Sequence, residues 1–152
     1  MKILMVCLGN ICRSPMAEGI LQHKIDSAGF DVKIDSCGTG AWHVGESPDR
    51  RAQAMMISKG MDISQLRARQ FSKTDFSDFD LIYVMDESNY KDVVSLADNK
   101  EQESRVCLIL NESNPNSNTP VPDPYYGGAN GFETVFQLLD DACDVIINRL
   151  SE

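Results

Sequence analysis

Short apolar runs alternate with stretches of helical periodicity along this chain, and no repeat, low-complexity tract or linker divides it. Met1 to Val6 is rich in apolar and branched residues, as is typical of a strand buried on both faces of a parallel sheet. Leu81 to Met85 and Arg105 to Leu110 have the same character. Phe30 to Ile34 alternates apolar and charged residues, which indicates a strand at a sheet edge. We therefore expect four parallel strands.

Four further segments have the apolar spacing of helices. The first extends from Ser14-Pro15, a capping residue followed by a first-turn proline, to Gly29. The second extends from Ser47-Pro48-Asp49 to Gly60, and the third is expected around Ser88 to Ala97. Phe132 to Leu150 places its apolar residues on one face of a long closing helix. The order of strands and helices predicts an α/β fold, in one domain over residues 1–152.

The net charge and the cysteine content of the chain argue against several classes of function. The net charge of −9 and the lack of a basic stripe argue against a nucleic-acid binder. Ile3 to Leu8 is too short for a membrane span or a signal-peptide core. Five irregularly spaced cysteines indicate reduced thiols in a cytoplasmic protein. Most basic residues fall between Met1 and Arg69, so we expect any anion site there.

One segment has the residues that phosphate chemistry needs. It consists of Cys7, Leu8, Gly9, Asn10, Ile11, Cys12, Arg13 and Ser14. The segment joins a buried strand to a helix N-terminus, where backbone N–H groups and the helix dipole favour an anion. Gly9 and Asn10 tolerate the left-handed backbone that a tight ring of N–H groups requires, and Arg13 adds a planar cation. This environment favours the thiolate of Cys7, to which Ser14 could donate a hydrogen bond.

Cys7 and Cys12 each allow a simpler interpretation. Cys7 could be only a buried thiol at a strand end, although the Gly-Asn turn, the arginine and the helix start together disfavour this. Cys12 could be plain packing or a partner that forms a disulfide with oxidised Cys7. Asp123 also allows two interpretations. It lies between two prolines in the long loop Asn111 to Asn130 and could be a catalytic acid, but Asp-Pro is also an ordinary turn sequence.

The segments Val6 to Pro15, Ala17-Glu18 and Asp123-Pro124-Tyr125-Tyr126 closely resemble the low-molecular-weight protein tyrosine phosphatases. The likeness extends over nearly the whole chain, including Ser36 to Pro48 and Ala68-Arg69-Gln70. The resemblance implies a three-layer, flavodoxin-like fold, that is, a four-stranded parallel sheet with helices on both faces. The chain differs from the family pattern at Leu66, where the family often has His, and at Cys37, where Ala is common.

The resemblance also implies the chemistry. Cys7 would form a phosphocysteine intermediate, Arg13 would bind the phosphate, and Asp123 would act as general acid and then as base. The aromatic walls of the pocket would be Trp42, Tyr125 and Tyr126, and the two tyrosines could themselves be phosphorylated. The substrate would be a tyrosine-phosphorylated protein or a small aryl phosphate, with vanadate as an inhibitory phosphate mimic.

The same resemblance implies no metal, cofactor, nucleic acid or membrane, and we expect a mainly monomeric protein. His23 and His43 each stand alone, so we interpret them as surface or loop residues and not as metal ligands.

Three rival functions remain open. An arsenate reductase of the same fold would need a cysteine relay, and Asp80 to Tyr90 contains no Cys. A related phosphoarginine phosphatase is expected to have Thr at the position of Ile11, so Ile11 favours an aryl ester. A phosphate-sensing module would replace Cys7 or Asp123 by inert residues, and both are present.

Overall fold

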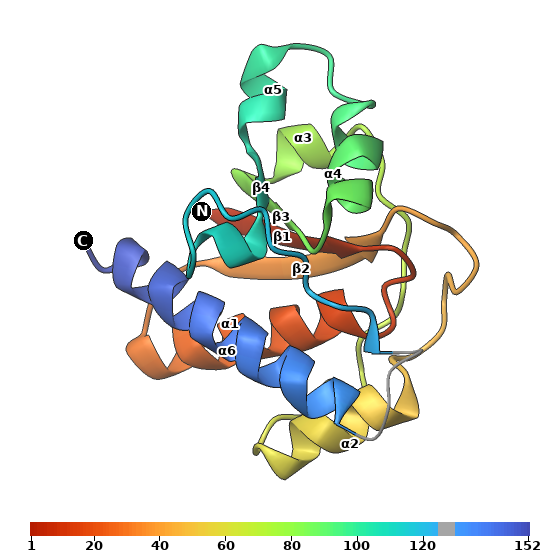
Figure 1. Ribbon diagram of the computed structural model, residues 1–152, viewed down its shortest axis with the longest axis vertical. Coiled ribbons are helices and arrows are strands. Elements are labelled where there is room, and N and C mark those ends of the chain that lie inside the picture. Colours follow the sequence, from red (N-terminus) through yellow and green to blue (C-terminus); the bar gives the residue numbers. More distant parts are fainter. Residues whose placement is uncertain (125–129) are drawn as a thin grey trace.

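The first apolar run forms β1, Lys2–Cys7, an inner strand of a four-stranded parallel sheet. The computed structural model describes residues 1–124 and 130–152. The strand order is β2-β1-β3-β4, with β2 at Lys33–Gly38, β3 at Leu81–Val84 and β4 at Val106–Leu108 (Figure 1). The four parallel strands and the edge position of the second strand are confirmed.

Helices cover both faces of this sheet (Figure 1). On one face lie α1, Arg13–Ala28, α2, Arg50–Ser58, and α6, Gly131–Leu150. The other face carries the shorter helices α3, Asp75–Asp78, α4, Glu87–Val94, and α5, Lys100–Ser104. The predicted three layers are therefore confirmed.

Alternate side chains of β1 enter two separate cores. Ile3 and Met5 pack with apolar residues of α1, α2 and α6, whereas Leu4 and Val6 pack with Phe76 and the other residues on the opposite face. Because all four are fully buried, this strand is fixed in position and in register, and so is the residue at its carboxyl end.

Two strand predictions need correction. β2 begins at Lys33 and not at Phe30, and it continues beyond Ile34 through Cys37 and Gly38. Gly38 fits there because a Cβ atom would lie 2.6 Å from the carbonyl oxygen of Leu8. The predicted strand to Leu110 ends at Leu108 and is followed by a 3-10 helix, η1, Ile109–Asn111.

The helix boundaries also differ in part. α1 begins at Arg13 with Cys12 at the N-cap, so Ser14 is not the cap as predicted and its hydroxyl is used elsewhere. α2 has Asp49 at its N-cap, where the carboxylate accepts a hydrogen bond from the backbone of Arg51. α4 is shorter than predicted, and α3 and α5 were not predicted. Within the described residues, none of the helices has the length and apolar character needed to span a membrane.

Candidate active site

The site lies where the carboxyl end of β1 meets the start of α1. The inner strands of the sheet are β1 and β3, and the chain leaves them in opposite directions, toward β2 and toward β4. Cys7 is the last residue of β1, and its sulfur is 3.0 Å from Ser14 Oγ. The backbone N–H of Asn10 donates a second hydrogen bond to this sulfur at 3.2 Å. These groups can hold negative charge on the sulfur.

Asn10 makes the turn of this loop. Its φ of 57° is left-handed, whereas Gly9 does not use that conformation, contrary to our expectation. Position 9 is instead close to a neighbouring side chain, since a Cβ atom there would lie 3.1 Å from Cδ2 of His43 and the imidazole would have to shift by a few tenths of an ångström. The predicted ring of inward N–H groups therefore depends on one left-handed residue and not on two.

The Asn10 side chain ties the loop to the rest of the protein. Its Nδ2 donates to Ser14 Oγ at 2.8 Å and to Ser36 Oγ at 3.0 Å, while its Oδ1 accepts from the backbone N–H of Arg69 at 3.1 Å. Asn10 is only 3% exposed, so every polar atom of its amide is satisfied by protein. No pattern in the sequence indicates these partners.

Arg13 is only 4% exposed, and its guanidinium is fixed on one side. Nη1 donates to Asp86 Oδ2 at 2.7 Å and to the carbonyl of Val121 at 3.0 Å. The other carboxylate oxygen of Asp86 accepts from the backbone N–H of Asn89 and caps α4. Among the described residues, Nε and Nη2 of Arg13 make no hydrogen bond, so these donors can bind an anion.

A cavity of about 330 Å³ opens above this loop. Its lining consists of Cys7, Leu8, Gly9, Ile11, Cys12, Arg13, Trp42, His43 and Asp123. The structure thus brings together the predicted nucleophile, phosphate clamp and acid, although Asp123 is more than a hundred residues from Cys7 in the chain. Asn10 and Ser14 are not part of this lining, and Tyr125 and Tyr126 fall outside the described residues.

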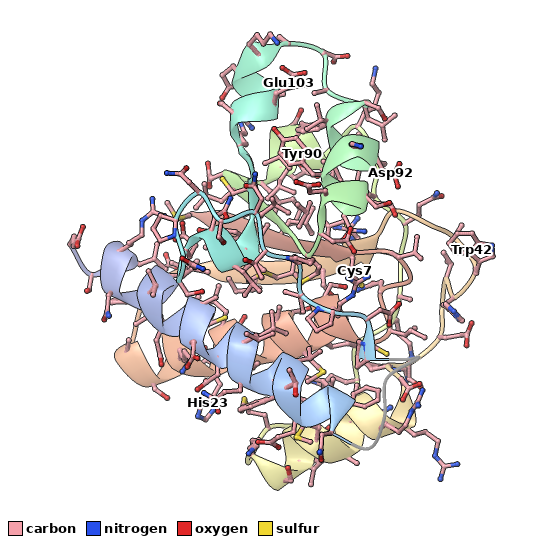
Figure 2. The ribbon with its side chains drawn as sticks, viewed as in Figure 1. Cys7, His23, Trp42, Tyr90, Asp92 and Glu103 are labelled. Carbon is pink, nitrogen blue, oxygen red and sulfur yellow. The ribbon has the colours of Figure 1, made fainter. Side chains whose placement is uncertain are left out.

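The segment after β2 forms one wall of the cavity. Trp42 is 72% exposed on this projecting segment, and its ring lies over Gly40, where a Cβ atom would meet the indole at 2.0 Å (Figure 2). His43 also lines the cavity, with Nδ1 held 2.9 Å from Glu46 Oε2. We had interpreted His43 only as a loop residue, and its place beside Trp42 was the one signal for a role in the cavity.

Burial keeps the remaining cysteines as thiols. Burial and the nearby Asp49, Cys7 and Asp123 raise the pKa of Cys12 to about 12. Burial also raises the pKa of Cys37, Cys107 and Cys143. All five cysteines are free, so the disulfide between Cys7 and Cys12, one of the two interpretations that the sequence left open, is not formed in this structure.

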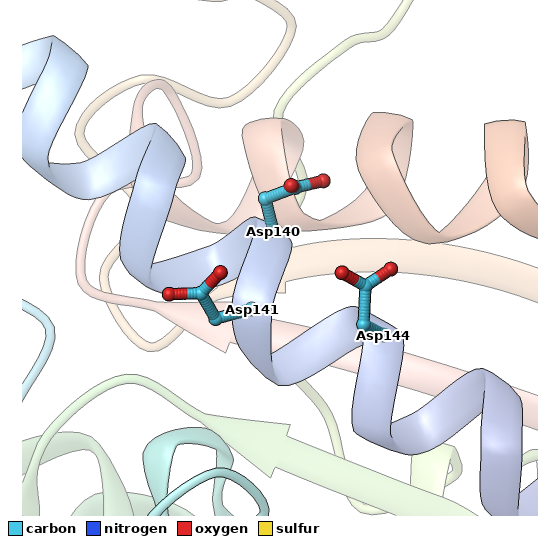
Figure 3. A group of neighbouring side chains, drawn as sticks. All are labelled: Asp140, Asp141 and Asp144. Atoms are coloured by element: carbon cyan, nitrogen blue, oxygen red, sulfur yellow. The ribbon is translucent and has the colours of Figure 1, made fainter.

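One carboxylate cluster could in principle hold a cation, and it lies on α6, away from the cavity (Figure 3). It consists of Asp140, Asp141 and Asp144. Lys24 Nζ already lies 2.9 Å from Asp140 and 2.7 Å from Asp144, so a lysine ammonium is already paired with two of the three carboxylates. In the part of the chain that the structure describes, no such group includes a cavity residue.

Comparisons with known proteins agree with this geometry. A family model described as low molecular weight phosphotyrosine protein phosphatase matches residues 2–152. A low molecular weight phosphotyrosine protein phosphatase of Schizosaccharomyces pombe is 43% identical over 91% of this chain and 90% of its own.

Two solved structures are also similar. The crystal structure of a protein tyrosine phosphatase from Entamoeba histolytica with Hepes in the active site has a TM-score of 0.92 at 35% identity, over 99% of this chain and 97% of its own. A Drosophila arginine phosphatase has a TM-score of 0.92 at 30% identity, over 100% of this chain and 99% of its own.

Proposed function

Since the chain belongs to the low molecular weight phosphotyrosine protein phosphatase family, a family of hydrolases, we propose that it hydrolyses phosphotyrosine and small aryl phosphates through a phosphocysteine on Cys7. The observation that supports this most directly is the shared cavity, in which Cys7, Arg13 and Asp123 meet. The proposal treats residues 1–152 as one phosphatase domain.

In the first step Arg13 Nε and Nη2, with backbone N–H groups of the loop, bind the phosphate oxygens. The Cys7 thiolate attacks phosphorus, a P–S bond forms, and the bond from phosphorus to the tyrosine oxygen breaks. Asp123 gives its proton to the leaving phenolate, which would otherwise be a poor leaving group. The product tyrosine leaves, and phosphate stays on sulfur.

In the second step the Asp123 carboxylate takes a proton from water as the water oxygen attacks phosphorus. The P–S bond breaks, inorganic phosphate is released, and Cys7 returns as thiolate. Ser14 Oγ, 3.0 Å from the sulfur, and the backbone N–H of Asn10 stabilise the charge that returns to it. The residues supply a nucleophile, an acid and a base without any further group.

Trp42 supports an aromatic substrate, because its exposed indole at the cavity wall can stack on a phenyl ring. Tyr125 and Tyr126 as the opposite wall, and their phosphorylation, stay predictions. The proposal further includes vanadate as an inhibitory phosphate mimic, a mainly monomeric protein and a cytoplasmic location, the last in keeping with its free cysteines.

An arginine phosphatase is the second candidate, because a Drosophila protein of that name has the same fold. The side chain at position 11 lines the cavity, and here it is the apolar Ile11, which offers no hydrogen bond to a guanidinium. We therefore propose that the enzyme hydrolyses an aryl phosphate faster than phosphoarginine.

The test measures hydrolysis of aryl phosphates with leaving phenols of increasing pKa, together with phosphoarginine, at mildly acidic pH and without added metal. We expect Cys7→Ser to abolish turnover and vanadate to inhibit the wild type. Asp123→Asn should slow phosphoryl transfer by about a hundredfold or more, and most for the phenols of highest pKa. Matched controls are Cys107→Ser, away from the cavity, and Asp92→Asn, exposed on α4 (Figure 2).

Equal losses for all leaving groups would contradict the role of Asp123 as acid. Faster hydrolysis of phosphoarginine than of any aryl phosphate would assign the chain to the second candidate. No turnover in folded, reduced protein would leave an arsenate reductase or a phosphate-sensing module.

A further inference from the structure

A chain of hydrogen bonds connects Cys7 in the phosphate loop to the half-buried carboxyl group of Glu18. Ser36 Oγ donates to Glu18 Oε1 at 2.6 Å and accepts from Asn10 Nδ2 at 3.0 Å. The same Nδ2 donates to Ser14 Oγ at 2.8 Å, and Ser14 Oγ lies 3.0 Å from the sulfur of Cys7. Glu18 does not line the active cavity, and the proposed mechanism gives it no role.

Donors and acceptors along this chain have one consistent direction. The backbone N–H of Arg69 must face an oxygen, so it fixes the Asn10 amide with its NH₂ group toward the two serines. Each serine oxygen therefore receives a hydrogen from Asn10 and must direct its own hydrogen elsewhere. The hydrogen of Ser36 goes to the Glu18 carboxylate, and that of Ser14 goes to the Cys7 sulfur or to the carbonyl of Cys37 at 3.3 Å.

Building on the proposed function, we propose that Glu18 is a positioning residue for Cys7, whose carboxylate holds Ser36 and Asn10 in the arrangement that directs the Ser14 hydroxyl to the sulfur. An ionised Glu18 withdraws the Ser36 hydrogen and makes that oxygen a stronger acceptor for Asn10. With the Asn10 amide held in place, Ser14 Oγ keeps accepting a hydrogen bond from Asn10 Nδ2. The hydroxyl of Ser14 then donates to the thiolate, which is the charged and so the stronger of its two acceptors.

Glu18 lies where its charge can change. It borders a second cavity of about 330 Å³ beside α1, together with Leu66 and Gly19. The charged and titratable groups around Glu18 are Asp35 of β2, Arg69, and three groups that line this cavity. These three are His23, Asp26 and Asp62. Burial raises the pKa of Glu18 to about 7, with Asp35 adding to the rise and Ser36 and Arg69 opposing it.

This environment predicts the direction of the pH effect. As the pH falls through about 7, Glu18 takes up a proton and holds the Ser36 hydrogen more weakly, because a neutral carboxyl oxygen is a weaker acceptor than a carboxylate. Ser14 is then less firmly oriented, and its hydroxyl can turn to the carbonyl of Cys37. The Cys7 thiolate loses part of its stabilisation below this pH.

The experiment measures the rate at which iodoacetamide alkylates Cys7 between about pH 5 and 9, with the modified cysteine mapped by mass spectrometry. The wild type should show an inflection near pH 7, where Glu18 changes its charge. Glu18→Gln should lose this inflection, because an amide keeps an acceptor for Ser36 but does not titrate. Glu18→Ala, which lacks the acceptor, should be alkylated about tenfold more slowly at about pH 8.

Asp26→Asn is the matched control, because it removes a carboxylate from the same helix and the same cavity but has no link to Asn10. It should keep the wild-type profile. An inflection that persists in Glu18→Gln, or disappears equally in Asp26→Asn, would overturn the inference. If Glu18→Ala fails to fold, the profile of Glu18→Gln alone decides.

Parallel assays of aryl phosphate hydrolysis separate this inference from the proposed function. Turnover of the aryl phosphate together with an alkylation profile that is independent of Glu18 would contradict the positioning role and leave the proposed function intact. An alkylation profile that depends on Glu18, in a protein without phosphatase activity, would contradict the proposed function and leave the positioning role intact.

Discussion

Asn10 is the residue on which the phosphate loop depends most. It combines a left-handed backbone with an amide that joins Ser14, Ser36 and the backbone of Arg69. Asparagine is one of the few residues that tolerate the backbone angle, and its short amide can reach both serines. Neither glycine nor aspartate would replace it, because glycine lacks the amide and aspartate cannot donate.

We therefore predict that Asn10→Ala lowers the free energy of unfolding by about 2–4 kcal/mol, because buried partners lose their hydrogen bonds and the backbone is strained. The catalytic rate should fall with it. The matched control is Asn116→Ala, an exposed residue with a φ of 62°, which should cost only the backbone strain of about 1 kcal/mol. Urea denaturation of both variants measures the two losses in the free energy of unfolding. Equal losses would show that the Asn10 amide contributes nothing to stability.

At this scale the sequence predicted the residues with reactive groups better than those that position them. Cys7 and Arg13 follow from a strand, a turn and a helix start, and Asp123 follows chiefly from the family resemblance. The roles of Asn10 and Glu18 depend on Ser36, which is far from both in the chain and comes close only when β2 pairs with β1. No local pattern carries that information.

Among the elements, β2 shows why a correct strand prediction can have wrong ends. Phe30 to Ile34 has the alternation of an edge strand, but pairing with β1 decides the ends, from Lys2 opposite Lys33 to Cys7 opposite Gly38. Gly38 lies beyond the predicted end of this strand, yet β2 needs glycine there because it approaches the carbonyl of Leu8 closely. The backbone N–H groups of Thr39 and Gly40 then bond to the carbonyls of Cys7 and Leu8 and fix the loop from this side.

Arg69 joins three elements on the same side of the site. Its guanidinium bonds to Asp35 of β2 and, through two nitrogens, to Asp75 at the start of α3, whose side chain is 4% exposed. Its backbone N–H holds Asn10, and its carbonyl accepts from the N–H of Gly38. The segment before α3, for which the sequence predicted no structure, is therefore held by one charged residue.

We predict that Arg69→Met lowers the free energy of unfolding by about 3–5 kcal/mol, because it leaves the buried carboxylate of Asp75 without its partner. Lys73→Met is the matched control, since Lys73 and Asp98 form an ion pair whose side chains are 61% and 62% exposed. Removing that pair should cost less than about 1 kcal/mol. Thermal unfolding of both variants tests this, and a loss in Arg69→Met as small as that of the control would contradict a structural role for the pair with Asp75.

For the whole molecule, the parallel order β2-β1-β3-β4 brings the active site together. The carboxyl ends of all four strands meet at one edge of the sheet, so the loop after β1 lies beside the segments that follow β2 and β3. The last long loop brings Val121 and Asp123 to the same edge. Strand count and layers could be predicted from periodicity and resemblance, whereas the path of that loop could not, because it contains few apolar residues to fix it.

The molecule as a whole carries a net charge of −9, and residues 70–152 contain sixteen of its acidic residues. A phosphorylated substrate must therefore approach a negative protein to reach the local positive charge of Arg13. Basic residues beside a phosphotyrosine would be attracted by the surrounding acidic surface, while acidic neighbours would be repelled. The preference should be electrostatic and long-range, so salt should weaken it.

We predict that phosphotyrosine peptides with Lys or Arg on both sides are hydrolysed with a kcat/KM about threefold to tenfold above that of length-matched acidic peptides at about 0.01 M salt. The ratio should fall toward one at about 0.15 M, where the screening length has shrunk from about 30 Å to about 8 Å. Phenyl phosphate, which has no flanking charges, is assayed at both salt concentrations to correct for effects on Arg13 and Cys7. A ratio that does not change with salt would place the preference in direct contacts at the cavity rim, and a preference for acidic peptides would show that the field of Arg13 outweighs that of the whole molecule.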